Sequence, residues 1–583
     1  MARIVIDPVT RVGGHLRVEL DVTSGAVTDA WTSGTMFRGI ELNLRGRDPR
    51  DVWMLAERIC GTCTGVHALA SVRAVENALG ITIPVNARLV RNLLSGTQLV
   101  RDHVVGFYQA QLPDWVDAKS AITADPSATA RLAATVAQRA NATTEAFQAV
   151  RDRLEAVVNS KQAGVLGTGW WGHPAYRLSP EQNLLLLAHF LEALDWQRDF
   201  MRIHALLGGK DPHPQTYLVG GMAVAPPWGG PTGAVGRDHP TVPDRNAPMP
   251  LSTDGLTLVD TLLTSARDFV DQVFVPDVRL LLGAYPEWAK IGAGPGSYLS
   301  AGDLPDSSAK DPQFLFPTGR LATGNLAASL PVEQDTIAES VAASWYSYAN
   351  TADGLVAAVT GETTPAWGGL ALPLKTLEGA KKYSWIKAAR YEGIPMEVGP
   401  LARLLVAVAN GRAELGAALA EQMAPVGLTL DTLPGVAGRI LARSVEAVVV
   451  IRQAATWLAD LRTNLGTGDV AVADITFWDP ASWPKETHGY SLGEGARGTV
   501  AHWVTIRDRT VVDYQVVDAS TWNASPRDSV NGHGPIEAAL ASVAIADPAR
   551  PLEALRVVHS FSPCGACAAH VFGPRATPGE GTR

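Results

Sequence analysis

The sequence predicts an α+β, mostly α fold, a large multi-segment architecture in which small β elements from both chain ends flank a central bundle of long helices. Several stretches repeat apolar residues at spacings of three and four, the period of a helix packed on one face. Both ends carry short apolar or alternating runs bounded by glycine, which is typical of strands. The chain has 583 residues, 46% apolar and 18% charged, so it can bury a large interior built from several segments.

The N-terminal residues 1–84 are predicted to be the first β-rich segment. Residues 3–7 and 15–22 run apolar or alternate, as strands do, and Gly13-Gly14 separates them. This segment also carries the first of two cysteine motifs.

Residues 85–490 are predicted to form the helical bundle. Helical periodicity covers residues 85–111, 128–160, 181–207, 254–283, 400–424 and 434–465. The last of these stretches is apolar on most sides, which indicates a helix buried within a bundle. The Pro/Gly-rich residues 225–250 and 291–311 are predicted to be long surface loops.

Residues 491–570 are predicted to bring β structure back. Residues 500–517 are strand-like, a short helix is expected at 535–545, and a strand at 555–560 is expected to deliver the last two cysteines. The final residues 571–583 are polar and rich in glycine and proline, a composition that does not build a core.

The charge and hydropathy of the chain restrict the kinds of molecule that it is expected to bind. The formal net charge is -9, from 49 basic and 58 acidic residues, which does not favour nucleic acid as a partner. The N-terminus lacks the pattern of a secretory signal, and no apolar run is long enough to span a bilayer. The expected location is therefore either cytoplasmic or membrane-associated through a partner subunit.

The four cysteines form two C-x-x-C pairs at opposite ends of the chain: Cys60 with Cys63, and Cys564 with Cys567. Two intervening residues let both thiolates face one metal ion. Four thiolates suit a structural zinc site or an iron–sulfur cluster. However, small zinc modules staple short loops with local pairs, and a chain this large needs no staple. A site that joins the two chain ends favours a functional metal centre.

The motifs around these cysteines resemble those of the large subunit of nickel–iron hydrogenases, and the resemblance covers nearly the whole chain. The matching stretches are IDPVTRVGGHL, GTMFRGIEL, GRDPRD, ERICGTCTGVHALAS, RDHVVGFYQ, LPDWVD, FLEALDWQR, GKDPHPQ, ARGTVAHW, DYQVV, TWNASPRD and SPCGACAAH. The resemblance implies an enzyme that oxidises H2 to protons and electrons.

The resemblance also implies how the cysteines are used. Cys60 and Cys564 would be terminal nickel ligands, while Cys63 and Cys567 would bridge nickel to an iron that carries carbon monoxide and cyanide. Soft thiolates suit nickel. The proton from H2 would go to a terminal cysteine, Cys564.

Further site residues carry over by position. Arg497 matches an arginine above the metals, and Asp102 matches the carboxylate that orients it. His67 matches a histidine that hydrogen-bonds a bridging cysteine sulfur, and Ser520 matches a hydroxyl that holds a cyanide ligand. Without the resemblance, Arg497 would be interpreted as part of an ordinary salt bridge, Asp102 as a solvated helix residue and His67 as a core histidine.

A magnesium site and a set of partners are also implied. Glu41, His570 and the backbone carbonyl of Val516 match magnesium ligands. The family is cleaved after the histidine of the last motif, so residues 571–583 are expected to be a removable extension. The implied partners are an iron–sulfur small subunit, a maturation protease and nickel-insertion factors, with a higher oligomer of heterodimers left open. Because the chain has only four cysteines, electrons must leave through another subunit.

Five positions depart from the family's usual pattern. Gly13 replaces a glutamate that carries protons, Ser562 replaces an aspartate, Ala496 and Ala519 replace prolines, and Asp518 replaces an apolar residue. Glycine cannot carry a proton, so a water chain or Asp518 is expected to substitute. These departures favour the alternative of a hydrogen sensor or weakly active relative, while the tail opposes it. A zinc tetrathiolate protein is the third alternative.

Overall fold

The computed structural model describes residues 2–160, 162–224, 249–308, 312–348, 351–366, 377, 382–528 and 532–568. Within these ranges the fold is mostly helical with several small sheets, as the sequence predicts. Most of residues 225–250, as well as His570 and residues 571–583, lie outside the described residues, so the predictions made for them stay predictions.

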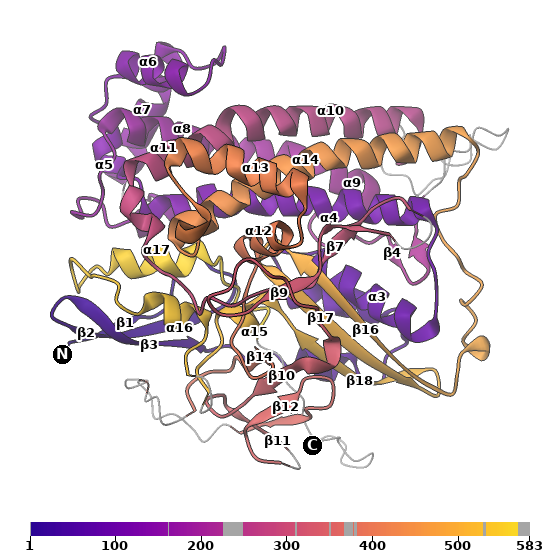
Figure 1. The fold of residues 1–583 in the computed structure, drawn as a ribbon. Coiled ribbons are helices and arrows are strands. Elements are labelled where there is room, and N and C mark those ends of the chain that lie inside the picture. Colours follow the sequence, from indigo (N-terminus) through magenta and orange to yellow (C-terminus); the bar gives the residue numbers. More distant parts are fainter. Residues whose placement is uncertain are drawn as a thin grey trace.

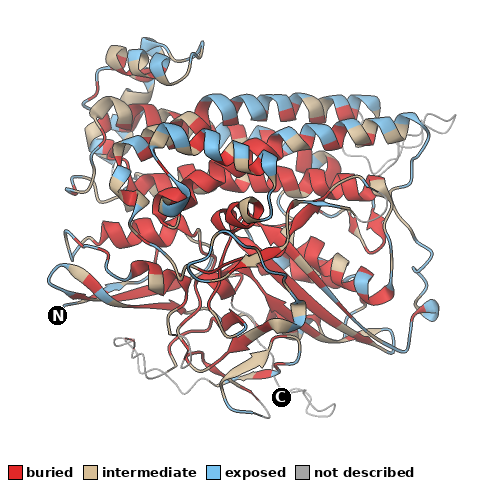
Figure 2. Cartoon of the chain, viewed as in Figure 1, coloured by how far each residue is buried: buried red, intermediate tan, exposed pale blue. Residues whose placement is uncertain are grey.

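Four long helices run side by side in the centre of the bundle: α4 (Val85–Val105), α8 (Pro180–Phe200), α10 (Thr253–Phe269) and α14 (Val436–Gly466). Helices α4 and α14 are the most deeply buried, whereas α10 exposes one face (Figure 2). The first half of α14, from Val436 to Ile451, is buried on every side because its sequence is mostly apolar and two of its charged residues, Arg439 and Glu446, are paired inside the protein.

The other helices surround these four or connect them to the sheets. They are α1 (Ile40–Leu44), α2 (Val52–Ala56), α3 (Val66–Leu79), α5 (Ala118–Ala121), α6 (Pro126–Val136), α7 (Thr144–Ser160), α9 (Arg202–Gly208), α11 (Val275–Ala284), α12 (Pro400–Ala409), α13 (Ala413–Met423), α15 (Ala519–Asn523), α16 (Pro535–Leu540) and α17 (Leu552–Ser560).

Each end of the chain contributes an antiparallel three-stranded sheet. The first is β1 (Ala2–Ile6), β2 (Leu16–Thr23) and β3 (Ala26–Gly34), and the second is β16 (Glu486–Gly495), β17 (Gly498–Arg507) and β18 (Thr510–Val517). Helix α3 packs against β16 and β17, and α16 packs against β3. The two sheets lie below the bundle, the N-terminal sheet at the left and the C-terminal sheet at the right of the view (Figure 1).

Short strands between the ends were not predicted from the sequence. They are β4 (Tyr217–Leu218), β5 (Gly221–Met222), β6 (Tyr298–Ser300), β7 (Asp303–Pro305), β8 (Phe314–Phe316), β9 (Gly319–Leu321), β10 (Ile337–Ser340), β11 (Tyr346–Tyr348), β12 (Leu355–Ala357), β13 (Thr363–Pro365), β14 (Ala388–Tyr391) and β15 (Glu397–Val398). Strands of two to four residues are too short to show a period in the sequence.

One predicted element has the wrong type. Residues 555–560, predicted as a strand, belong to helix α17, and all nine residues of that helix are buried. A short apolar run does not distinguish a strand from a buried helix. The helix is favoured because both of its faces find partners: Arg556 stacks over Trp115 at 4.1 Å, and His559 Nδ1 lies 2.6 Å from Asp114 Oδ2.

Two stretches that were each predicted as one helix are divided in the structure. The 128–160 stretch divides into α6 and α7, and 254–283 divides into α10 and α11 with a π-helical turn at Val270–Phe274 between them. A second π-helical turn, Gly106–Gln111, continues α4. Such turns often occur at functional sites. Among the described residues no helix combines the length and hydropathy needed to cross a bilayer.

Candidate metal centre

The four cysteines lie in two short loops at the junction between the bundle and the sheets. Cys60 follows a single 3-10 turn after α2, and Cys63 precedes α3. Cys564 and Cys567 follow directly after α17, so the helix that was predicted as a strand is the element that positions them. All four side chains are buried.

The structure brings the two cysteine pairs together. The sulfur atoms of Cys60 and Cys564 are 3.9 Å apart, and those of Cys63 and Cys567 are 4.0 Å apart. Within the C-terminal pair, Cys567 Sγ lies 2.9 Å from Cys564 Sγ. Two overlapping groups of possible metal ligands result, Cys60 with Cys564 and Cys567, and Cys63 with His67 and Cys567. The residues therefore fit a metal centre with four sulfur ligands.

Electrostatics favour a cation between these sulfurs. Hydrogen bonds from the Cys564, Cys567 and Cys63 thiols lower the pKa of Cys60 well below its ordinary value. A hydrogen bond from the Cys567 thiol lowers the pKa of Cys564. The hydrogen bond to Cys60 and burial outweigh this effect and raise that pKa to about 12. Without a cation, only one of these thiols ionises readily. Four adjacent thiolates need metal charge among them.

The loop between β1 and β2 packs directly against the C-terminal cysteine pair. Gly13 forms a parallel β-bridge with Cys564, and the Ala566 N–H donates to the Gly13 carbonyl at 3.3 Å. Gly14 has φ 73°, and a Cβ there would lie 2.3 Å from the Ala566 nitrogen. Glycine at position 14 is therefore required for the chain ends to approach this closely.

Arg497, at the turn between β16 and β17, carries the charge that faces the thiols. Burial opposes its charge, but Cys63, Cys564, Cys60 and Asp102 raise the pKa of Arg497 above its usual value. Its Nη1 lies 3.9 Å from Asp102 Oδ2, and its Nε and Nη1 atoms have no hydrogen-bond partner. Asp102 is also paired with Arg101 at 2.9 Å. The predicted pairing of Arg497 with Asp102 is thus a long ion pair.

His67 lies in a buried chain of hydrogen-bonding side chains. Its Nδ1 is 3.0 Å from Nε2 of His502, whose Nδ1 is 2.8 Å from the Tyr514 hydroxyl. Burial lowers the pKa of His67 to about 4, so the ring is neutral at pH 7. Its remaining ring nitrogen lies in the group formed with Cys63 and Cys567. No role was predicted for His502 from the sequence, although it is the histidine of the matching stretch ARGTVAHW.

Ser520 contacts the backbone of a cysteine rather than a sulfur. Its hydroxyl accepts a hydrogen bond from the Cys564 N–H at 2.9 Å. Asp518 begins α15: its carboxylate accepts from the Ser520 N–H at 2.6 Å and from the Thr521 hydroxyl at 3.0 Å. Burial raises the pKa of Asp518 to about 7. The unusual Asp518 therefore has a structural role, because it caps the short helix that carries Ser520.

Glu41 and Val516 are neighbours, as a shared metal site requires. The Val516 N–H donates to Glu41 Oε1 at 2.9 Å, while Glu41 Oε2 is buried without a partner. Burial raises the pKa of Glu41 to about 8. The ion pair of Lys387 with Glu339 lies nearby and influences that pKa. An unpartnered buried carboxylate oxygen fits the requirement for a cation. His570 lies outside the described residues.

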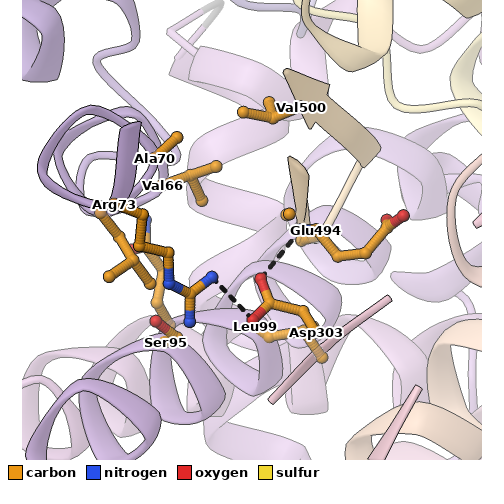
Figure 3. A pocket seen from close by; sticks show the side chains of 13 residues that line it. Val66, Ala70, Arg73, Ser95, Leu99, Asp303, Glu494 and Val500 are labelled. Atoms are coloured by element: carbon orange, nitrogen blue, oxygen red, sulfur yellow. Dashed lines mark hydrogen bonds and ion pairs between the residues drawn. The ribbon is translucent and has the colours of Figure 1, made fainter. Parts of the chain in front are cut away.

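A small cavity lies between the bundle helix α4 and the C-terminal sheet (Figure 3). Its volume is about 20 Å³, and α3, α4 and β16 line it. Arg73 donates to Asp303 at 2.9 Å, and Asp303 also accepts the N–H of Glu494 at 2.9 Å. The Glu494 carboxylate binds Arg403 at 2.7 Å. Each charge at this cavity thus has an opposite charge beside it.

The fold and the site together define a class of protein, one with a buried metal centre built from sulfur ligands at both chain ends. A family model described as nickel-dependent hydrogenase matches residues 38–570, and a model described as HoxL-like matches residues 3–33. The chain belongs to the nickel-dependent hydrogenase family. This match favours a nickel–iron centre over the zinc and iron–sulfur alternatives that the cysteine spacing left open.

Relatives match over almost their whole length. The uptake hydrogenase large subunit of Bradyrhizobium diazoefficiens is 42% identical over 98% of this chain and 96% of its own. The hydrogenase-1 large chain of Escherichia coli K12 is 40% identical, with 98% and 95% covered.

Solved structures share the fold. The Ni-Fe-Se hydrogenase of Desulfovibrio vulgaris Hildenborough is similar with a TM-score of 0.75 and 29% identity, covering 98% of this chain and 100% of that one. The Ni-Fe-Se hydrogenase of Desulfomicrobium baculatum is similar with a TM-score of 0.71 and 29% identity, with the same coverage.

Proposed function

We propose that this chain is the catalytic large subunit of a nickel–iron hydrogenase that oxidises H2 and passes electrons to an iron–sulfur small subunit. One observation carries the proposal: cysteine sulfurs from both ends of the chain lie within 4.0 Å of one another in a buried site beside Arg497. When bound, the nickel–iron centre would supply the cleavage and oxidation of H2, which yields two protons and two electrons.

The protein supplies a base and a fixed positive charge to this reaction. We assign Cys564 Sγ as the proton acceptor and Cys60 as the other terminal ligand, with Cys63 and Cys567 as bridging ligands. Arg497 stabilises negative charge at the centre because its guanidinium is permanently charged and held in a site where burial strengthens Coulomb interactions. Asp102 limits the orientations of that guanidinium through their ion pair at 3.9 Å.

The surrounding residues hold the outer ligands and tune the sulfurs. We propose that iron carries carbon monoxide and cyanide, and that the Ser520 hydroxyl donates a hydrogen bond to a cyanide nitrogen. Ser520 is suited to this because α15 fixes its backbone and the Cys564 N–H already occupies its acceptor side. His67 is assigned a hydrogen bond to a bridging sulfur, a contact that adjusts the electronics of a metal site.

We also propose a magnesium ion bound by Glu41, the Val516 carbonyl and His570. The partnerless Oε2 atom of Glu41 supports a cation there. Removal of residues 571–583 by a maturation protease, and loading by nickel-insertion factors, belong to the same proposal.

Infrared spectroscopy and metal analysis of the purified heterodimer test the proposal. We expect equal amounts of nickel and iron, no stoichiometric zinc, and absorption bands of metal-bound carbon monoxide and cyanide that disappear in Cys567→Ser. Zinc in place of nickel and iron would overturn the assignment.

A hydrogen sensor or weakly active relative is the second candidate. Gly13 and Ser562 favour it, because neither side chain can carry the proton away from Cys564 as a carboxylate would. H2-dependent dye reduction per nickel distinguishes the two: steady multiple turnover supports the uptake enzyme, whereas a spectral response to H2 without turnover supports the sensor.

A further inference from the structure

A second cavity lies beside Cys564, on the bundle side of Arg497. Its volume is about 40 Å³, and it is enclosed by the loop of Gly13, the end of α4, the first half of α14 and the loop of Ser562. A cavity needs roughly 10–15 Å³ of such volume to hold one water molecule, so this one accommodates a small ion or a few waters. None of the four cysteines lines it, so its contents need not depend on the metal centre.

Three arginines line this cavity; Arg497 has Asp102 and the cysteine sulfurs as counter-charges, whereas Arg443 has no ion-pair partner among the described residues. Arg11 forms an ion pair with Asp114 at 2.5 Å. Arg443 is 3% exposed and makes one hydrogen bond, from Nη2 to the Ser560 carbonyl at 2.8 Å. Within the part of the chain that the structure describes, Arg443 forms no ion pair, and its Nε has no partner. The Nε and Nη1 atoms of Arg497 also lack partners.

The carboxylates near the cavity already face other cations. Asp102 lines it and is shared between Arg101 at 2.9 Å and Arg497 at 3.9 Å, although its Oδ2 atom accepts no hydrogen bond. Glu446 is bound by Arg403 at 2.6 Å and by His103 at 2.8 Å. Two positions on the wall, Gly13 and Ser562, carry no charge. The cavity of Figure 3 differs in this respect, since Arg73, the arginine that lines it, donates to the carboxylate of Asp303.

A buried guanidinium without an anion is costly. Burial lowers the pKa of Arg443 to about 9; the charge of Glu446 opposes this shift, and the neighbouring charge of Arg497 adds to it. Both groups are nevertheless charged at pH 7. Arginines in dry surroundings bind carboxylates and other small anions through charge-assisted hydrogen bonds.

We propose that this cavity is a binding site for a small monovalent anion, the size of formate, hydrogen carbonate or chloride, held between the guanidinium groups of Arg443 and Arg497. The anion supplies the negative charge that the side chains of residues 13 and 562 do not supply. It lies next to the cysteine pair without being a ligand of the metals. A formate-sized carboxylate uses the planar donor geometry of arginine, whereas chloride uses only its charge.

Calorimetric titration of the full-length chain tests the site, both as the metal-loaded heterodimer and as the chain produced without nickel. Sodium formate, sodium hydrogen carbonate and sodium chloride are titrated separately at constant ionic strength set with gluconate. We expect saturable one-site binding in both forms, with dissociation constants of about 1 mM. Stronger binding of formate than of chloride identifies a carboxylate site, and the reverse order identifies a halide site.

A matched pair of variants separates charge from shape. Ser562 has φ 51°, a conformation that both Asp and Asn tolerate. Ser562→Asp places a carboxylate in the cavity, so formate binding is expected to weaken at least tenfold, equivalent to about 1.4 kcal/mol. Ser562→Asn has the same shape without the charge and is expected to bind formate nearly as well as the unmodified chain.

Arg443→Lys and Arg443→Met provide a second comparison. The lysine variant is expected to retain weaker binding and the methionine variant to lose it, with circular dichroism used to check that each is folded. A crystal soaked in bromide should show an anomalous peak between residues 443 and 497. The proposal fails if no anion binds saturably to the unmodified chain, or if Ser562→Asp binds formate as well as Ser562→Asn does.

Discussion

Arg497 shows how one side chain can be tested apart from the fold. Its guanidinium faces the thiols and forms a long ion pair with Asp102, in which Nη1 and Oδ2 are 3.9 Å apart. Arg497→Lys keeps a positive charge but loses the rigid fork of donors. We expect H2-dependent dye reduction to fall about 10²- to 10³-fold, the usual cost of removing a donor aimed at developing charge. Nickel and iron content, measured by mass spectrometry, should not change.

An exposed arginine provides the control for this substitution. Arg507 on β17 pairs with Glu486 at 2.8 Å, and its side chain is 43% exposed. Arg507→Lys should leave both metal content and rate unaltered, since exposed ion pairs contribute little. Full activity in Arg497→Lys at full metal content would show that the fixed fork is unnecessary.

The residues of the site differ in how far sequence alone could predict them. The spacing of the cysteines is enough to predict them as metal ligands, whereas roles for Arg497, His67 and Ser520 could be predicted only from the resemblance to a family. Arg443 could not have been found, because one arginine inside a long helix looks like any other. Its importance comes from the absence of an ion-pair partner among the described residues, and that is a property of packing.

At the scale of the elements, the contact between α4 and α14 depends on a residue without a side chain. A Cβ on Gly96 would lie 2.7 Å from Trp457 Cζ3 and 3.1 Å from Val450 Cγ1. Gly96→Ala should therefore destabilise the protein by about 1–3 kcal/mol, because overpacking outweighs the gain in helix propensity. Urea unfolding followed by circular dichroism measures the change.

Gly416 on α13 is the matched control, because it is also inside a helix but a Cβ there meets nothing within 4 Å. Gly416→Ala should be neutral or stabilise by about 0.5–1 kcal/mol. Equal effects of the two substitutions would show that helix propensity, and not packing between α4 and α14, governs position 96.

Charges buried between elements should make stability depend on pH. Burial opposes the ionisation of Glu446, but Arg403 on α12 and His103 on α4 hold its pKa at about 2. Its folded pKa is below the unfolded value, so its stabilisation is present above about pH 4.5 and is lost as the pH falls toward 2.

Glu446→Gln should therefore lower the free energy of unfolding by about 3–5 kcal/mol at pH 7, because it removes one of the two carboxylates that neutralise the buried Arg403. The difference between the variant and the unmodified chain should shrink between pH 4.5 and 2, as measured by urea unfolding at each pH. A constant difference across that range would mean that Glu446 is not ionised in the folded protein.

Element types were predictable where the sequence is long and periodic, as in α4, α8 and α14. They were not predictable at α17, where the 555–560 run suits a strand and a buried helix equally. Tertiary contacts decide there: Arg556 stacks over Trp115, and His559 reaches Asp114. The boundaries between α6 and α7 and between α10 and α11 carry only local signals, the Thr143 hydroxyl at the start of α7 and Pro276 in the first turn of α11.

At the scale of the whole molecule, the metal centre joins segments that are as distant in sequence as the chain allows. The N-terminal loop, the first cysteine pair and the loop after α17 meet through the Gly13–Cys564 bridge and the sulfurs 3.9–4.0 Å apart. A ligand that binds only the folded state stabilises what it contacts. Loss of the metals should therefore loosen both chain ends together.

Hydrogen exchange measures this directly. In the chain produced without nickel, amides of residues 60–65 and 562–568 should exchange faster than in the metal-loaded protein, and by similar factors. Amides of α8 and α10 should be unchanged, because those helices are stabilised by the bundle core. Faster exchange at one cysteine pair alone would mean that the other is held by its own segment. The metal would then complete a site whose two halves are stable independently, instead of tying the ends of the chain together.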